Sequence, residues 1–184
     1  ALLPGGLATA VFSGPVAVFL SFATVAAEQR GMANAGAVWL TYVGGAAFVR
    51  LFGGRLPDRL GPSNLVAPSI AAYALGMLIL ARAEAPPAFL LAGLLGGLGH
   101  GYGFPVLVSQ VVTRTPERLR GTAMAVFTGL FDLTALTFNP SFGLVAAWID
   151  FEAAFTVAAG TCVLGLAVWA LLEHRSGASP PVDC

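Results

Sequence analysis

The sequence contains no lysine, and only 10% of its residues are charged. Nine arginines balance nine acidic residues among 184 residues, so the formal net charge is zero. Soluble domains carry about 25% charged residues, and so few charges cannot cover the surface of an ordinary cytosolic domain. A hydrophobic content of 57% excludes a disordered chain. Neutral net charge argues against a nucleic-acid partner.

Cysteine is also scarce. Cys162 lies within an apolar run and Cys184 ends the chain. Two cysteines in these places form neither a disulfide framework nor a metal site. We therefore expect no metal and no cofactor.

Long apolar runs between the charges dominate the sequence. A membrane-spanning helix needs about 20 mostly apolar residues to cross about 30 Å of hydrocarbon. The runs lack the alternation of barrel strands, and six buried helices in succession would leave a soluble protein without a polar face. The predicted fold is an all-α membrane bundle over residues 1–172, with six transmembrane helices at about 5–27, 34–53, 63–82, 88–113, 121–147 and 153–172. Residues 173–184, which are polar and rich in Pro and Ser, are predicted to be a disordered cytoplasmic tail.

The arginines are unevenly divided between the two predicted membrane faces. Arg30 and Arg82 fall on one face, and the other seven fall on the face that holds both termini. Because arginine-rich loops stay in the cytoplasm, both termini are predicted to be cytoplasmic, in a multi-pass protein of the cell (inner) membrane. The chain begins Ala-Leu-Leu-Pro, without Met or the basic start of a signal peptide, so we expect a piece of a longer protein.

Glycine is frequent in the fourth predicted span. Gly93, Gly97 and Gly101 recur every four residues, and Gly99 and Gly103 form a second row. Small residues at this spacing let helix backbones approach closely in lipid. We interpret both rows as packing surfaces.

Polar residues at membrane depth are candidates for a solute pathway. Asp132 lies about 17 Å into its span, near the midplane, where an aspartate costs about 2.5–3.5 kcal/mol to insert. Thr128 and Asn139 share its helical face. His100 is near the middle of its own span and has a reference pKa of about 6.5, so it can exchange protons near neutrality. The first span adds a polar stripe that includes Ser13 and Ser21.

Each candidate has a structural alternative that the sequence leaves open. Asp132 is as readily a hydrogen-bonding anchor between helices. His100 can simply bond a neighbouring carbonyl, and the Ser and Thr hydroxyls of the first span can bond back to their own helix.

The connection between the second and third spans carries a motif. It reads Gly-Gly-Arg-Leu-Pro-Asp-Arg-Leu-Gly over residues 53–61. Here the sequence resembles the major facilitator superfamily of secondary transporters, whose loop Gly-x-x-x-Asp-Arg-x-Gly joins the second and third helices of each six-helix half. The matching residues are Gly54, Asp58, Arg59 and Gly61. Pro62 and Ser63 replace the usual basic pair, so this is a degenerate copy, as is often found in the second half of such proteins.

The resemblance covers about residues 7–172 and implies the C-terminal half of such a transporter. That half would consist of two inverted three-helix repeats, 7–82 and 88–172, and would pair with a missing N-terminal six-helix half. The motif would act as a conformational latch near the start of the fifth span, with Arg114 or Arg118 as ion-pair partners of Asp58. Alternatively, the arginines of the loop only fix topology.

The resemblance leads us to expect a secondary active transporter that moves a small solute by alternating access. A proton-coupled efflux permease is favoured, with Asp132 or His100 as proton carrier; a sugar or organic-acid uptake permease is the alternative within the family. The expected partners are the solute, H+, the lipid bilayer and the missing half, with no nucleic acid.

Two functional classes other than a transporter are alternatives. A truncated, non-transporting scaffold stays open. An intramembrane protease is disfavoured, because Ser109 lies nine residues from His100 on one helix, too far for a direct hydrogen bond. We therefore do not expect an enzyme.

Overall fold

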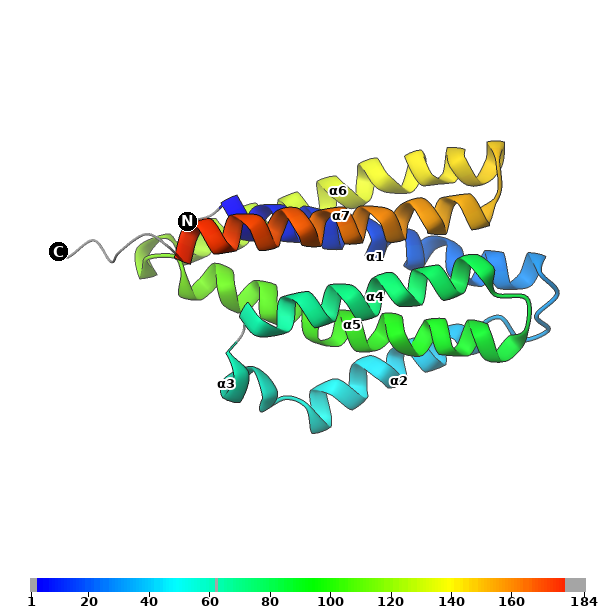
Figure 1. The fold of residues 1–184 in the computed structure, drawn as a ribbon, viewed down its shortest axis with the longest axis horizontal. Coiled ribbons are helices and arrows are strands. Elements are labelled where there is room, and N and C mark those ends of the chain that lie inside the picture. Colours follow the sequence, from blue (N-terminus) through cyan, green and yellow to red (C-terminus); the bar gives the residue numbers. More distant parts are fainter. Residues whose placement is uncertain (1–2, 62, 178–184) are drawn as a thin grey trace.

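The computed structural model describes residues 3–61 and 63–177, with backbone only for residues 3–8, 58, 63 and 172–177. The described part is helical almost throughout. Its elements are α1 (Leu3–Gln29), α2 (Ala37–Phe52), α3 (Leu56–Leu60), α4 (Ser63–Arg82), α5 (Pro86–Thr113), η1 (Glu117–Leu119), α6 (Arg120–Trp148) and α7 (Phe151–Gly177). Consecutive long helices run in opposite directions (Figure 1).

Six of these helices are long, as the hydropathy predicts. Five are long and apolar enough to cross a membrane, and α2 is a shorter apolar helix of 16 residues. The prediction placed the start of this helix at residue 34, but residues 33–36 form turns, because Asn34 and Gly36 favour turn conformations. The six-helix, all-α membrane fold is confirmed.

Two further features lie outside the predicted spans. The short elements α3 and η1 occupy the connections before the third and the fifth predicted span. α7 continues to Gly177, so residues 173–177 are helical and not part of a disordered tail. Glu173 and Arg175 are good helix formers, which favours this extension. Residues 178–184 of the predicted tail lie outside the described residues.

The helices pack as two interleaved three-helix units. α1 packs mainly on α6 and α7, while α5 packs mainly on α2 and α4, and α4 also contacts α7. The two groups correspond when α1 is matched with α5, α2 with α6 and α4 with α7. The contacts of α5 with α2 and α4 then correspond to those of α1 with α6 and α7, and the α4–α7 contact corresponds to itself. This is the packing expected of two inverted repeats, each of which places its first helix between helices of the other.

α5 is the central helix of its group, and its glycines allow this position. A Cβ atom on Gly97 would overlap the backbone of Tyr42 in α2. On Gly99 it would lie 2.7 Å from the Ser69 carbonyl oxygen of α4, and on Gly103 it would lie 2.6 Å from the ring of Phe12 in α1. The glycine rows are therefore packing surfaces toward three different helices.

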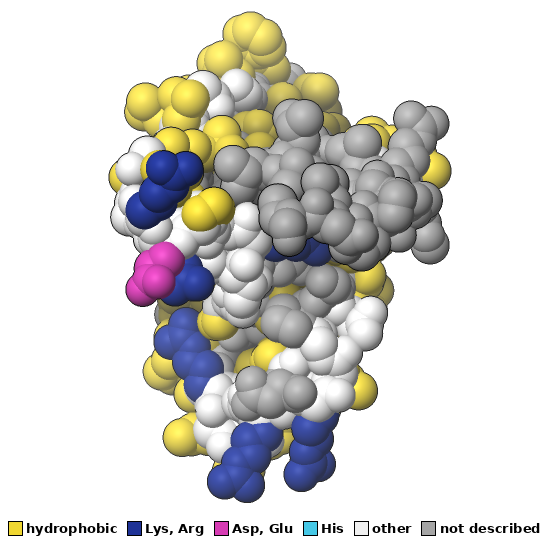
Figure 2. Space-filling view, turned by 90° about the vertical axis from the view of Figure 1, so that its left-hand side faces the viewer, with side chains coloured by type: hydrophobic (Ala, Val, Ile, Leu, Met, Phe, Trp, Pro, Cys, Tyr) yellow, Lys and Arg dark blue, Asp and Glu magenta, His cyan; other side chains and the backbone are white. Residues whose placement is uncertain are grey.

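The arginines gather at one end of the bundle. Figure 2 looks at this end and shows several Arg side chains, in dark blue, along the left and lower edges of the view. Six described arginine side chains belong to the elements or connections at this end, namely Arg50, Arg55, Arg59, Arg114, Arg118 and Arg120. Arg30 and Arg82 lie at the opposite end. The fold therefore preserves the charge asymmetry that predicts membrane orientation.

Candidate transport site

His100 of α5 is held by a tyrosine of the neighbouring helix. The hydroxyl of Tyr42 in α2 and Nδ1 of His100 are hydrogen-bonded at 2.5 Å. Tyr42 is buried and stacks on Phe19 of α1, with ring centroids 5.1 Å apart. The imidazole is half-buried, so part of its surface is packed against other side chains and part is left uncovered by the described chain. This arrangement orients the imidazole within a membrane span.

Aromatic rings extend from His100 across the bundle. Phe12 of α1 and Phe104 of α5 lie within 6.0 and 6.1 Å of the imidazole, measured between ring centroids. Phe104 in turn contacts Phe127 and Phe131 of α6, at 5.8 and 5.7 Å. We call His100, Tyr42, Phe12, Phe104, Phe127 and Phe131 the ring cluster. It joins helices from both repeats around one polar pair.

The ring cluster includes residues that the sequence analysis missed. Tyr42 was not among the candidates, although the sequence contains a signal: Trp39 and Tyr42 are three residues apart and share a helical face. The same holds for Phe127 and Phe131, which are four residues apart. These spacings indicate aromatic faces, but they do not reveal which helices meet.

The predicted pathway residues fall into separate environments. Asp132 and Thr128 are exposed on α6, and Ser21 is exposed on α1. Asn139 is half-buried, and its Oδ1 has no hydrogen-bond partner among the described residues. Ser13 is fully buried and donates its hydroxyl to the Ala10 carbonyl at 3.3 Å, the back-bonded alternative. Among the described contacts, none joins these residues directly to His100.

α6 leaves much of its surface uncovered by the rest of the chain. Only 11% of the apolar stretch of α6 is buried by the described part of the chain, against 50% of the apolar stretch of α5. Asp132 lies on this open surface, and no hydrogen bond or ion pair joins it to the described residues. A carboxylate at this depth requires a polar surrounding, which the described part of the chain does not supply.

The motif loop is anchored to the bundle through its first residues. The Tyr102 hydroxyl of α5 donates to the Gly53 carbonyl at 3.2 Å. Gly61 ends α3 with φ at +82°, a conformation that favours glycine. Asn64 then donates its side-chain amide to the Leu60 carbonyl at 2.7 Å. The backbone conformation at the end of α3 therefore explains why the motif ends in glycine.

The structure describes the arginine side chains of the predicted latch. The side chain of Asp58 lies outside the described residues, so its pairing with Arg114 or Arg118 stays a prediction. Arg59 and Arg118 are exposed, and Gly54 lies in the turn before α3. Arg114 follows α5 and is half-buried.

A polar contact at the opposite end was not predicted. Arg82 of α4 and Glu152 of α7 form an ion pair of 2.6 Å. Arg30, just after α1, donates to the carbonyls of Leu80 and Ala83 at 2.9 and 3.0 Å. These contacts tie α1, α4 and α7 together where α4 ends.

Comparison with known proteins decides the family. The sequence model of the Major Facilitator Superfamily matches residues 5–183. The chain belongs to the major facilitator superfamily. Together with its apolar helices, membership in this family of transporters makes the chain an integral, multi-pass membrane protein.

Relatives of this superfamily chain are about twice as long. An MFS-type transporter of Salmonella typhimurium is 31% identical over 171 residues, which cover 89% of this chain and 44% of the relative. Proteins named MFS-type transporters from Pseudomonas aeruginosa and Burkholderia mallei are 29% and 30% identical, over 94% and 95% of this chain and 43% of each relative. The chain therefore spans less than half the length of these relatives, which fits one six-helix half.

Proposed function

We propose that this chain is the C-terminal half of a secondary active transporter that exports a small, largely apolar solute by alternating access. The ring cluster around His100 is the observation that carries this proposal. Its rings come from α1, α2, α5 and α6, so a movement of one repeat against the other changes the spacing around the polar pair. Aromatic faces with one oriented imidazole suit a planar, weakly charged solute.

Proton coupling is the second part of the proposal. His100 is half-buried and fixed by Tyr42, while Asp132 is exposed on the open surface of α6. An uncovered aspartate at membrane depth supports a water-filled cavity on this side, closed by the missing half. In such a cavity, His100 or Asp132 takes up a proton from one side of the membrane and releases it on the other.

The experiment is an efflux assay on the full-length protein. Everted membrane vesicles take up ethidium when a proton gradient is imposed, and a protonophore abolishes the uptake. His100→Gln and Asp132→Asn are each expected to reduce proton-driven uptake, by about tenfold or more for the residue that carries the proton. Thr156→Val, on an exposed position of α7, is the control and leaves uptake unchanged.

The outcomes separate coupling from substrate recognition. If both variants keep full proton-driven uptake, neither residue carries the proton and the coupling proposal is wrong. If no gradient drives ethidium uptake by the wild type, export of a planar, weakly charged solute is contradicted.

A further inference from the structure

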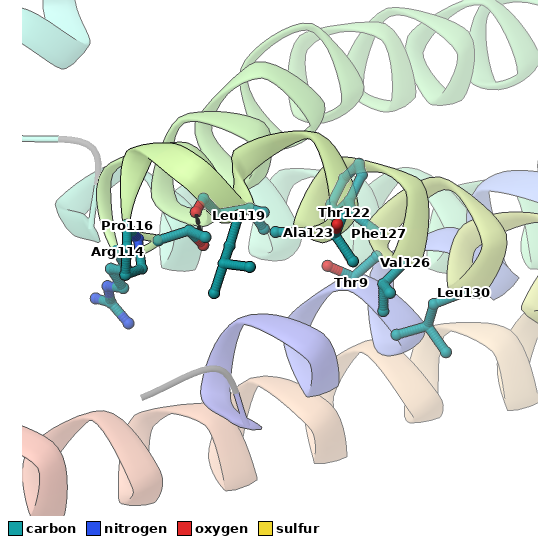
Figure 3. Close-up of a pocket in the computed structure, with 11 residues that line it drawn as sticks. Thr9, Arg114, Pro116, Leu119, Thr122, Ala123, Val126, Phe127 and Leu130 are labelled. Atoms are coloured by element: carbon teal, nitrogen blue, oxygen red, sulfur yellow. Dashed lines mark hydrogen bonds between the residues drawn. The ribbon is translucent and has the colours of Figure 1, made fainter.

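A pocket lies where α5 turns into α6, at the arginine-rich end of the bundle. Its volume is about 260 Å³. The end of α5, the connection that contains η1 and the first turns of α6 form its walls, and Thr9 of α1 lines another side (Figure 3). His100 is 14 residues from Arg114 along α5, which corresponds to about 21 Å. The polar end of the pocket is therefore far from the polar pair of the ring cluster.

The pocket is polar at one end and apolar at the other. Arg114 and Thr115 lie at the end toward the α5–α6 connection, and the Thr115 hydroxyl already donates to the Val111 carbonyl at 2.6 Å. Farther along α6 the lining consists of Val126, Phe127 and Leu130. Figure 3 shows Arg114 and Leu130 at opposite ends of the labelled residues.

The length of this lining matches one leaflet of a membrane. Leu119 and Leu130 are 11 residues apart on η1 and α6, which corresponds to about 16 Å along the helix axis. This is about half of the roughly 30 Å of hydrocarbon in a bilayer. A narrow, one-leaflet-long apolar wall with a cation at its end fits an acyl chain better than a compact solute.

Charge at the polar end is complementary to a phosphate. Arg118 and Arg120 flank Leu119, and both are exposed, as is Glu117, the one acidic residue in this connection. With Arg114, they make three arginines among the seven residues 114–120, and of these three Arg114 is the one that lines the pocket. Basic pockets between transmembrane helices on the cytoplasmic side bind lipid head groups.

We propose that this pocket binds an anionic phospholipid of the leaflet at the arginine-rich end. One acyl chain lies along Val126, Phe127 and Leu130, and the phosphate accepts hydrogen bonds from Arg114 and its neighbouring arginines. Phe127 belongs both to this pocket and to the ring cluster, where it contacts Phe104. The lipid therefore touches an aromatic side chain of the candidate transport site.

The test uses the full-length protein in vesicles of equal parts phosphatidylcholine and phosphatidylglycerol. Lipid retained by the protein after purification in mild detergent is counted by native mass spectrometry. The wild type is expected to retain phosphatidylglycerol in preference to phosphatidylcholine. Ala123→Trp fills the pocket and Arg114→Gln removes a charge-assisted hydrogen bond, and each is expected to lower retention about tenfold.

Two controls match these changes outside the pocket. Ala167→Trp adds the same ring on an exposed position of α7, and Arg55→Gln removes an exposed arginine at the same end. Both are expected to retain the lipid. Val126→Phe fills the pocket with a smaller change and replaces Ala123→Trp if that variant does not fold.

Several results would overturn the proposal. Equal retention of the two lipids, or equal retention by all variants, would show that the pocket does not select an anionic lipid. Displacement of the lipid by millimolar glycerol phosphate would show a free-anion site instead. Retention of no lipid by the wild type would mean that another part of the full-length protein covers the pocket.

Discussion

The hydroxyl of Tyr102 donates a hydrogen bond to the carbonyl of Gly53, and this bond joins the middle of α5 to the end of α2. The motif loop starts at this point, so the bond ties the beginning of the loop to α5. A Cβ atom on Gly53 would overlap the Tyr102 hydroxyl, which shows how closely the two approach. The start of the loop is therefore packed tightly against α5.

Tyr102→Phe is expected to loosen the motif loop without unfolding the bundle. The change removes one hydrogen bond, worth about 1 kcal/mol, and keeps the ring. Hydrogen exchange of the backbone amides in residues 53–61 should become faster, while residues 86–100 of the same molecule serve as the internal control. Unchanged exchange in the loop would show that the Tyr102 bond does not hold it.

Asp58→Asn is expected to slow transport while leaving membrane insertion intact. The predicted latch places the Asp58 carboxylate near the start of the fifth span, α6. An anion at the start of a helix stabilises it by roughly 0.3–1 kcal/mol, and by up to about 2 kcal/mol when partly buried, so the loss of this charge is expected to weaken the latch. The rate of proton-driven uptake in vesicles and the amount of protein in the membrane are measured together. Transport kinetics equal to those of the wild type would count against a latch role for this residue.

Gly97→Ala is expected to destabilise the bundle by about 1–3 kcal/mol, because the added methyl group meets the backbone of Tyr42 and not a movable side chain. Gly129→Ala is the matched control, since nothing lies within 4 Å of the added atom. That variant should be neutral or slightly more stable, as alanine is the better helix former. The midpoint of thermal unfolding in detergent, compared for both variants, decides between these outcomes.

The ion pair of Arg82 and Glu152 is expected to contribute little. Its side chains are 74% and 48% exposed, and exposed pairs measure about 0.2–1 kcal/mol in double-mutant cycles. A cycle of Arg82→Gln and Glu152→Gln should give a coupling energy in this range that decreases with added salt. A larger, salt-independent coupling would show that the full-length protein buries the pair.

Hydropathy was sufficient to predict the six long helices of the described part, because membrane spans depend on local composition. The spacing of Gly93, Gly97 and Gly101 likewise predicted close packing, although not which helix fills each row. The short helix α3 and the extension of α7 into the predicted tail were missed, because brief polar segments carry no periodic signal.

The candidate site was less predictable for a physical reason. His100 stood out as an isolated polar residue, but its partner Tyr42 is 58 residues away and belongs to the other repeat. Such a contact depends on how the two repeats interleave, which no local pattern encodes. Ser13 looked equivalent to Ser21 in the sequence, and only the packing shows that one is buried and the other exposed.

The proposed alternating access requires that α6 faces a cavity that opens in turn to the two sides of the membrane. The most direct test is labelling of Thr128→Cys, on the exposed face that α6 shares with Asp132, by a membrane-impermeant thiol reagent in full-length protein whose other cysteines are replaced. This choice leaves both candidate proton carriers intact. Labelling is expected from both sides, with the preferred side changed by a proton gradient. Val163→Cys, exposed on α7, serves as the lipid-facing control and should not react. Absence of labelling at Thr128→Cys from either side would contradict a cavity along α6.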